Sequence, residues 1–214
     1  MFQKPIAIFG GTFDPIHFGH LRTALEIYDT CQLAEVRFIP CYQPVHRERP
    51  VASPEDRLNM ITLAIKDESA FKVDDCEIKR QGPSYMVDTL ETLRKNISDQ
   101  TPLCLIMGID ALLGFAQWHR YDDILKLAHL IIAHRPDYQL PENGTIAHLL
   151  KDSVKKDIHQ TRSGSIILQP VTALEISATE IRKALAKGKN PRFLLPDSVY
   201  EYIKQHGIYH SNSL

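Results

Sequence analysis

Residues 6–20 read IAIFGGTFDPIHFGH, and this stretch decides the fold. Four apolar residues end at Gly10-Gly11, which is typical of a buried strand followed by a tight turn. The segment from about Phe18 to Cys31 then carries apolar side chains at helical spacing, so a strand, a loop and a helix are predicted in direct succession. The free N–H groups and the positive dipole end of such a helix favour a phosphate at the loop.

The alternation of strand and helix continues along the chain. We expect further strands at 36–39, 71–78, 103–107, 130–133 and 166–171, and further helices at 53–65, 84–97, 178–186 and 198–206. This order predicts an α/β protein with a Rossmann-like, doubly wound, mostly parallel sheet, helices on both faces and ligands at the carboxyl ends of the strands. One domain is expected over 1–214, with a core over about 1–176 and a small C-terminal helical extension over about 177–210. The polar stretch 136–164 is interpreted as an elaboration of that domain.

The composition excludes several classes of protein. Of the 214 residues 43% are hydrophobic and 24% charged, and the net charge is -1, so no strong basic field attracts nucleic acid or an anionic membrane. No apolar stretch is long enough for a signal peptide or a membrane span. Four cysteines without a C-x-x-C pair argue against a disulfide framework and favour the cytoplasm. A local anion site remains compatible with all of this, whereas the oligomeric state is left open.

The first candidate site is the histidine pair of this opening stretch. His17 and His20 are three residues apart, which at a helix start puts both rings on one side, and Gly19 keeps that side open. Two imidazoles there can donate hydrogen bonds to phosphate oxygens. The pattern is neither a Walker A loop nor a G-x-G-x-x-G fingerprint. Two incidental histidines after a glycine turn are the plainer alternative, and a zinc site is a weaker one.

The second candidate site is EISATEIR, residues 175–182. Ser177 with Glu180 fits a capping box that opens a helix just after the last strand, and Thr179 and Arg182 share a face of that helix. An arginine beside hydroxyls suits a polyphosphate, although a plain capped helix with a solvated arginine explains the same residues. Both candidate helix starts follow strands of one sheet, so a nucleoside triphosphate between the histidine pair and Arg182 is predicted.

Together these segments resemble a known family. GGTFDPIHFGH and ISATEIR are similar to the two signatures of the bacterial nicotinate-mononucleotide adenylyltransferases, within the nucleotidyltransferases marked by H-x-G-H. The resemblance continues through residues 44–47, 82–90, 108–110, 118–119 and 200–209, so that it covers nearly the whole chain. The first signature alone also occurs in cytidylyltransferases and in pantetheine-phosphate adenylyltransferases.

The resemblance implies an enzyme that joins ATP and nicotinate mononucleotide into nicotinate adenine dinucleotide and pyrophosphate. It implies catalytic roles for His17, His20 and Arg182. It implies ATP binding by Gly10, Gly11, Thr12, Phe13, Gly108, Asp110, Ser177 and Thr179. It implies substrate binding by His46, Arg47, Tyr85, Met86, Trp118 and His119, with the indole as a stacking surface for the pyridine ring. Mg²⁺ is expected to be held mainly by ATP phosphates and water, with no protein metal ligand, since Asp14 before a proline is more often structural.

Three positions depart from the family pattern. Arg47 replaces a lysine, Ala178 replaces a serine, and Met86 replaces a threonine that usually helps to bind the pyridine carboxylate. Methionine offers no comparable donor, so the preference for nicotinate over nicotinamide mononucleotide stays open. Transfer to another small phosphate such as phosphopantetheine, and a non-catalytic nucleotide-binding module, are the remaining alternatives.

Overall fold

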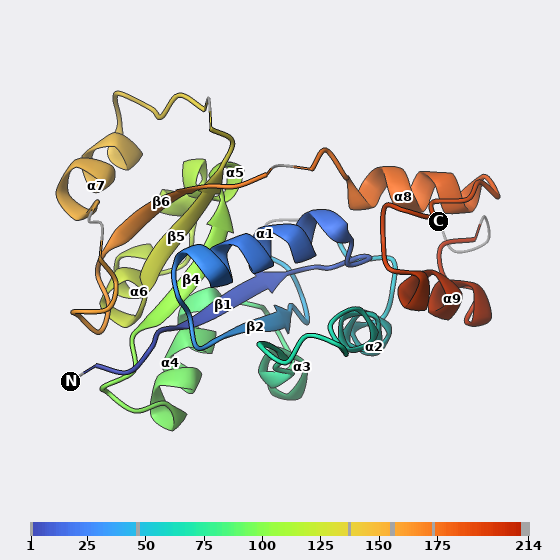
Figure 1. Cartoon of the computed structure of the whole chain (residues 1–214), viewed down its shortest axis with the longest axis horizontal. Coiled ribbons are helices and arrows are strands. Elements are labelled where there is room, and N and C mark those ends of the chain that lie inside the picture. Colours follow the sequence, from blue (N-terminus) through green and yellow to red (C-terminus); the bar gives the residue numbers. More distant parts are fainter. Residues whose placement is uncertain (1, 46–47, 137, 155–156, 173, 211–214) are drawn as a thin grey trace.

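The computed structural model describes residues 2–45, 48–136, 138–154, 157–172 and 174–210. Within them, six strands form one sheet in the order β3-β2-β1-β4-β5-β6, and every neighbouring pair is parallel (Figure 1). The strands are β1 (Ile6–Gly11), β2 (Glu35–Pro40), β3 (Phe71–Val73), β4 (Leu103–Gly108), β5 (His129–His134) and β6 (Ile166–Pro170). The prediction of a doubly wound parallel sheet is therefore confirmed.

Helices follow the strands along the chain. They are α1 (Phe18–Thr30), α2 (Pro54–Ala64), α3 (Cys76–Arg80), α4 (Met86–Asn96), α5 (Ile109–Leu113), α6 (Tyr121–Leu127), α7 (Thr145–Ser153), α8 (Ala178–Ala186) and α9 (Asp197–Gln205), with a short 3-10 turn at Phe115–Gln117. The residues at the start of α2 explain why the helix begins there. Ser53 Oγ accepts a hydrogen bond from the Asp56 N–H at 3.0 Å, and Pro54 occupies the first helical position.

The core lies on both faces of the sheet, because alternate residues of each strand point to opposite sides. One face carries Ala7, Val36, Phe38, Cys104, Ile106, Ile131 and Ile167, which pack with residues of α1, α2, α8 and α9. The other face carries Ile8, Leu103, Leu105, Met107, Leu130, Ile132 and Ile166, which pack with residues of α4 to α7. Strands buried on both sides read as continuous apolar runs, which is why the sequence pattern located them.

Two local predictions are wrong, and one helix was not predicted. The strand expected over 71–78 ends at Val73, because Asp74 Oδ1 accepts a hydrogen bond from the Cys76 N–H at 3.0 Å and turns the chain into α3. The helix that was not predicted is α7, which lies within the stretch 136–164 that we interpret as an elaboration of the domain. Ser177 precedes α8, but in the described part of the chain its side chain makes no capping hydrogen bond, and Glu180 instead accepts one from Lys183 Nζ at 2.8 Å.

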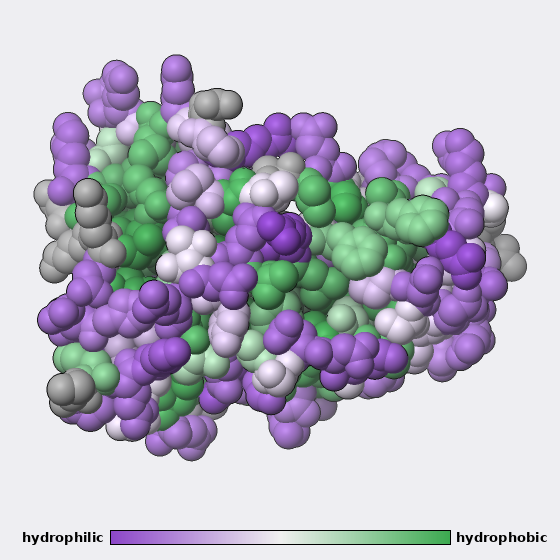
Figure 2. Space-filling view, in the orientation of Figure 1, coloured by the Kyte–Doolittle hydropathy of each residue, from purple (hydrophilic) through white to green (hydrophobic). Residues whose placement is uncertain are grey.

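The C-terminal helices α8 and α9 lie beyond the carboxyl end of β1, beside α2 (Figure 1). On the face drawn in Figure 2, hydrophilic side chains dominate the rim, while hydrophobic ones gather over the middle and towards α8 and α9. The exposed large apolar residues near α1 and α9 include Phe18, Phe193 and Leu194. None of the helices formed by the described residues has the length and apolar character to cross a membrane.

Candidate active site

A cavity of about 460 Å³ lies at the carboxyl edge of the sheet, where the central strands end. The loop after β1, the ends of β2 and β4, and the segments around α4 and α5 enclose it. Of the residues predicted for the site, those that line it are Gly10, Gly11, Thr12, Phe13, His20, Tyr85, Met86, Gly108, Asp110, Trp118 and His119. Parallel strands end at one edge, so residues far apart in sequence meet here.

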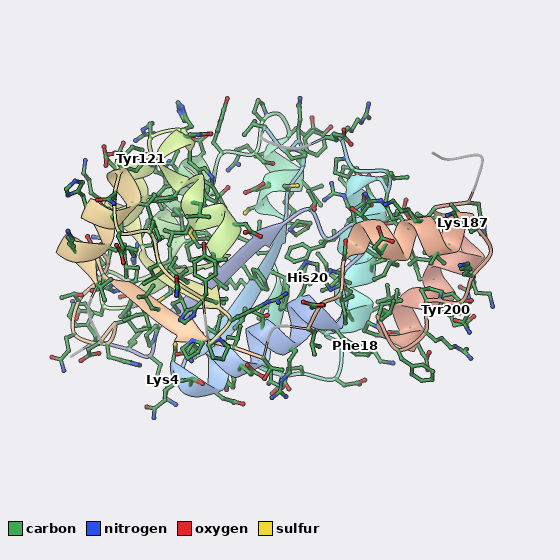
Figure 3. The ribbon with its side chains drawn as sticks, turned by 90° about the horizontal axis from the view of Figure 1, so that it is seen from above. Lys4, Phe18, His20, Tyr121, Lys187 and Tyr200 are labelled. Atoms are coloured by element: carbon green, nitrogen blue, oxygen red, sulfur yellow. The ribbon has the colours of Figure 1, made fainter. Side chains whose placement is uncertain are left out.

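The histidine pair begins α1. The rings of His17 and His20 stack with centroids 3.8 Å apart and planes inclined by 27°, and the His17 N–H donates to His20 Nδ1 at 3.3 Å. A Cβ on Gly19 would meet the His17 ring at 3.0 Å, so the glycine is what allows this arrangement. Figure 3 places His20 between the sheet and the C-terminal helices, near the start of α1.

His17 is the more deeply buried of the two histidines. It is 6% exposed, and burial lowers the pKa of its imidazole from 6.5 to about 4. The ring is therefore neutral at pH 7, with one N–H to donate. Its Nδ1 is buried and has no hydrogen-bond partner among the described residues. A phosphate nearby would favour the charged imidazolium and raise this pKa.

The loop after β1 approaches the opposite wall closely. A Cβ on Gly10 would lie 2.6 Å from Met86 Cε, so only glycine leaves the methionine its present place. Phe13 adopts a φ of 50°, and its ring packs edge-on against the His20 ring at 5.1 Å. The loop, the histidine and the start of α4 thus form one packed unit around the cavity.

Asp14 is a structural centre of this loop. Its Oδ2 accepts a hydrogen bond from the Val51 N–H at 2.9 Å, and its Oδ1 accepts from the Ala52 N–H at 3.0 Å and the Tyr209 hydroxyl at 2.7 Å. With three donors on two oxygens, this carboxylate does not fit a metal-ligand role. No cluster of three or more His, Cys, Asp and Glu side chains suited to a metal ion occurs in the parts of the chain that the structure describes.

Arg182 reaches the same loop from α8. Its Nη1 donates to the Asp14 carbonyl oxygen at 2.7 Å and lies 3.6 Å from Asp14 Oδ2, and its Nη2 donates to Thr179 Oγ1 at 3.4 Å. Ser177 and Thr179 are exposed. These three residues and His17 are not among the residues that line the cavity, so they lie behind or beside it. The structure joins Arg182 to the histidine loop, but through the Asp14 backbone.

The other side of the cavity is aromatic. The rings of Tyr85 and His119 lie 4.5 Å apart at 39°, and Trp118 packs edge-on against Phe115 at 5.5 Å. His119 is exposed, whereas Tyr85 and Trp118 are half-buried. Two further predicted substrate residues, His46 and Arg47, lie outside the described residues.

Sequence reasoning missed Arg57, which shapes the site from behind. It is 0% exposed, and its guanidinium donates to the carbonyl oxygens of Thr12 at 2.8 Å and Cys41 at 2.7 Å and, more weakly, of Ala52 at 3.4 Å. An arginine on an amphipathic helix is usually solvated, so its position in the chain carries no signal of this role. Glu77, which lines the cavity and is 3% exposed, was missed for the same reason.

A parallel sheet with a glycine loop and a histidine pair at its carboxyl edge defines a nucleotidyltransferase of the cytidylyltransferase-like class, and the family model of that description matches residues 8–184. Among curated relatives, a probable nicotinate-nucleotide adenylyltransferase of Aeromonas hydrophila is 47% identical over 212 residues, which cover 98% of this chain and 99% of that protein. One of Methylococcus capsulatus is 44% identical over 208 residues, which cover 95% and 99%. The chain belongs to the nicotinate-nucleotide adenylyltransferase family.

Solved structures agree on the fold. A nicotinic acid mononucleotide adenylyltransferase of Plasmodium falciparum, complexed with NaAD, superimposes with a TM-score of 0.75. The two sequences are 21% identical, and the match covers 97% of this chain and 98% of that one. At this identity the likeness bears on the architecture, while the family assignment rests on the closer sequence relatives.

Proposed function

We propose that this chain transfers the adenylyl group of ATP to nicotinate mononucleotide, giving nicotinate adenine dinucleotide and pyrophosphate, in the biosynthesis of NAD. The observation that carries the proposal is the stacked pair His17 and His20 at the start of α1, with His20 on a cavity whose other side is aromatic. The names of the close relatives, at 44–47% identity over nearly the whole chain, support the same reaction.

The reaction is a direct displacement at phosphorus. An oxygen of the mononucleotide phosphate forms a bond to the α-phosphorus of ATP, and the bond from that phosphorus to the pyrophosphate oxygen breaks. The attacking phosphate is already an anion at neutral pH, so neither a general base nor a covalent protein intermediate is required. Catalysis then depends on alignment and on stabilising charge that builds on the leaving pyrophosphate.

The histidine pair suits that charge. His20 lines the cavity near the positive end of α1, so its ring can donate to phosphate oxygens there, and we assign the same role to His17, which stacks against it. Negative charge in the cavity favours protonation of His17, because it acts against the burial that lowers the pKa of this imidazole. Arg182 would contribute by exchanging the Asp14 carbonyl oxygen for a phosphate oxygen.

The two substrates are assigned to different walls. We assign the ATP to the backbone of Gly10 to Phe13, to Gly108 and Asp110 after β4, and to Ser177 and Thr179 before and in α8. We assign the pyridine mononucleotide to Tyr85, Met86, Trp118 and His119, together with His46 and Arg47. An indole face suits an electron-poor, positively charged pyridine ring, which supports placing that ring on Trp118.

Magnesium belongs to this proposal as a companion of ATP. We assign its coordination to phosphate oxygens and water, because the carboxylate oxygens of Asp14 already accept three hydrogen bonds. Removal of divalent cations by a chelator should abolish turnover, and added Mg²⁺ should restore it.

The proposed reaction also bears on the extent of the domain, its partners and its location. We propose that residues 1–214 form one nucleotidyltransferase domain that acts on small molecules, and neither nucleic acid nor a membrane takes part. A cytoplasmic location is supported by the four free thiols, Cys31, Cys41, Cys76 and Cys104. Nicotinamide mononucleotide, which has an amide in place of the carboxylate, is the second candidate substrate, because the Met86 side chain at the cavity offers no hydrogen-bond donor to a pyridine carboxylate.

Pyrophosphate release tests the proposal. ATP is supplied with nicotinate mononucleotide, nicotinamide mononucleotide or phosphopantetheine in parallel reactions, and initial rates are compared. The highest kcat/KM with nicotinate mononucleotide is expected. Equal rates with the amide would remove the acid preference, the highest rate with phosphopantetheine would replace the substrate, and ATP binding without release in any reaction would indicate a non-catalytic module.

A further inference from the structure

Glu77 is a buried carboxyl group on the cavity that the displacement at phosphorus does not use. It lies on α3, is 3% exposed, and lines the cavity together with Ser84, Tyr85 and Met86. A carboxylate held out of water is costly unless donors surround it. The groups that bind the Glu77 carboxylate therefore indicate its role.

A hydroxyl group of α4 donates a hydrogen bond to this carboxylate. Thr89 Oγ1 lies 2.6 Å from Glu77 Oε1, and it also accepts a hydrogen bond from Arg80 Nη2 at 3.0 Å. A guanidinium only donates, and the other acceptor of Thr89, the Tyr85 carbonyl oxygen, lies farther away at 3.4 Å, so the single hydroxyl proton of Thr89 is directed to Glu77. The Ser84 side chain is near enough to the same carboxylate to act on its pKa, which it lowers.

Ser84 forms hydrogen bonds with the segment that follows β2. Its Oγ accepts hydrogen bonds from the Tyr42 N–H at 2.9 Å and the Gln43 N–H at 3.2 Å, while its own N–H donates to the Gln43 carbonyl oxygen at 2.8 Å. Ser84 Oγ is the acceptor in both of these bonds, so its hydroxyl proton is not used by the segment after β2. Glu77 thus joins α3 to α4 through Thr89, while Ser84, on the same cavity and directly before Tyr85, is joined to the segment after β2.

The charge of Glu77 is balanced from outside the cavity. Burial raises its pKa, whereas the hydrogen bonds from Ser84 and Thr89 and the charges of Arg80 and Arg57 act against that rise. The two arginines lie in or behind the wall and do not line the cavity. The network therefore fixes the wall's shape without placing a free cation in front of the substrate.

We propose that Glu77 is a positioning residue for the pyridine mononucleotide: by binding Thr89 one turn into α4, it fixes Tyr85 and Met86 in the wall against which that substrate binds. The proposal rests on the proposed function, because it assigns this wall to the mononucleotide and the glycine loop to ATP. Glu77 touches neither reacting phosphate. Its loss should accordingly weaken one substrate selectively.

Steady-state kinetics with each substrate varied separately tests this assignment. Glu77→Gln places an NH₂ group where a hydroxyl proton is directed, so one hydrogen bond of the network is lost. The KM for nicotinate mononucleotide should rise about tenfold, as expected for a lost hydrogen bond to a charged group, while the KM for ATP and kcat stay within about twofold. Thr89→Val removes the hydroxyl that donates to Glu77, with little change of volume, and should raise the same KM without changing the other.

Two matched variants serve as controls. Thr89→Ser keeps the hydroxyl group, and Glu91→Gln makes the same substitution as Glu77→Gln at an exposed position of α4 that pairs with Arg120 at 2.7 Å. Both should behave like the wild type. If Glu77→Gln does not fold, judged by its thermal unfolding, Thr89→Val carries the test alone.

The outcomes separate this inference from the proposed function. A wild-type protein that releases no pyrophosphate with any pyridine mononucleotide contradicts the proposed function itself. An active wild type whose Glu77→Gln and Thr89→Val variants have an unchanged KM for the mononucleotide overturns the positioning role. Equal increases in both KM values also overturn it, because they would indicate a general loss of structure.

Discussion

The Tyr209 hydroxyl donates a hydrogen bond to Asp14 Oδ1 at 2.7 Å, which anchors the histidine loop to a residue 195 positions further along the chain. Tyr209 is 0% exposed, and burial together with the Asp14 charge raises the pKa of its phenol. The same aspartate accepts a hydrogen bond from Arg182 through its carbonyl oxygen. The tyrosine therefore helps to place both Asp14 and the arginine that we assign to catalysis.

Tyr209→Phe tests that connection. It removes the hydroxyl and leaves Asp14 Oδ1 one donor short, so the free energy of unfolding should fall by about 1–3 kcal/mol in urea denaturation. The displaced arginine should also lower kcat more than it raises either KM. Tyr28→Phe, the same change on α1, is the control. A destabilised Tyr209→Phe protein with normal kcat would limit the tyrosine to a role in stability.

The histidine pair should dominate turnover. His17→Ala or His20→Ala is expected to lower kcat about 10²- to 10³-fold, as for other preorganised donors to developing charge, without unfolding the protein. His148→Ala, at an exposed position of α7, should leave kcat unchanged. Circular dichroism establishes folding in each case. Near-normal turnover in both variants of the pair would contradict the assignment.

Burial of neutral His17 predicts a pH dependence of stability. The unfolded histidine takes up a proton near pH 6.5, while the folded one does so only near 4. Acid therefore favours the unfolded chain, and this contribution is fully present above about pH 6.5, falls with decreasing pH and levels off below about 4. It is worth up to about 3 kcal/mol.

The difference between the wild type and a variant isolates that contribution. In urea denaturation at a series of pH values, the wild type should lose stability between pH 7 and 4 more steeply than His17→Asn does. His148→Asn should follow the wild-type curve. Parallel curves for the wild type and His17→Asn would show that His17 titrates normally.

The close contact between Gly10 and Met86 predicts a coupled pair. In Gly10→Ala the new methyl group displaces the flexible end of Met86 towards the cavity, so the KM for the mononucleotide should rise severalfold, with a stability cost of only about 1 kcal/mol. In a Met86→Ala background the same alanine should have little further effect. Additive effects of the two changes on KM, in a double-mutant cycle, would show that the contact is unimportant.

Trp118 offers a direct optical test, because it is the only tryptophan of the sequence. A pyridinium ring stacked on the indole should quench its fluorescence when nicotinate mononucleotide is added, with saturation near the KM. ATP alone should quench much less. Trp118→Ala should raise the KM for the mononucleotide about tenfold or more. Equal quenching by ATP alone would contradict the assignment of the pyridine ring to Trp118.

Local pattern predicted the fold well. The strands at 103–107 and 130–133 are buried on both faces and read as uninterrupted apolar runs, and the helix predicted at 178–186 is α8. Short polar elements were missed: α3 spans five residues, and Asp74 ends the preceding strand through a single side-chain hydrogen bond. A single side-chain hydrogen bond of this kind can end a strand or start a short helix, and the pattern of apolar residues does not reveal it.

In the candidate site, too, local contacts could be predicted from the sequence and long-range contacts could not. The spacing of His17 and His20 is local and fixes their stacking, so the sequence indicates it directly. The partners of Asp14 come from Val51, Ala52 and Tyr209, and no local pattern joins these positions. Contacts between distant segments depend on the finished packing of the sheet and its helices, which propensity and periodicity do not encode.

Arg57 holds the Thr12 carbonyl oxygen from behind the glycine loop. In a planar trans peptide the N–H points opposite to the C=O, so the Phe13 N–H is turned away from the guanidinium. A cation on the oxygen end also draws electron density from the amide and strengthens its N–H as a donor. The loop thereby gains positive potential from a charge that occupies no space in front of it, and a lysine, with one point charge for three carbonyl groups, would not reproduce this arrangement.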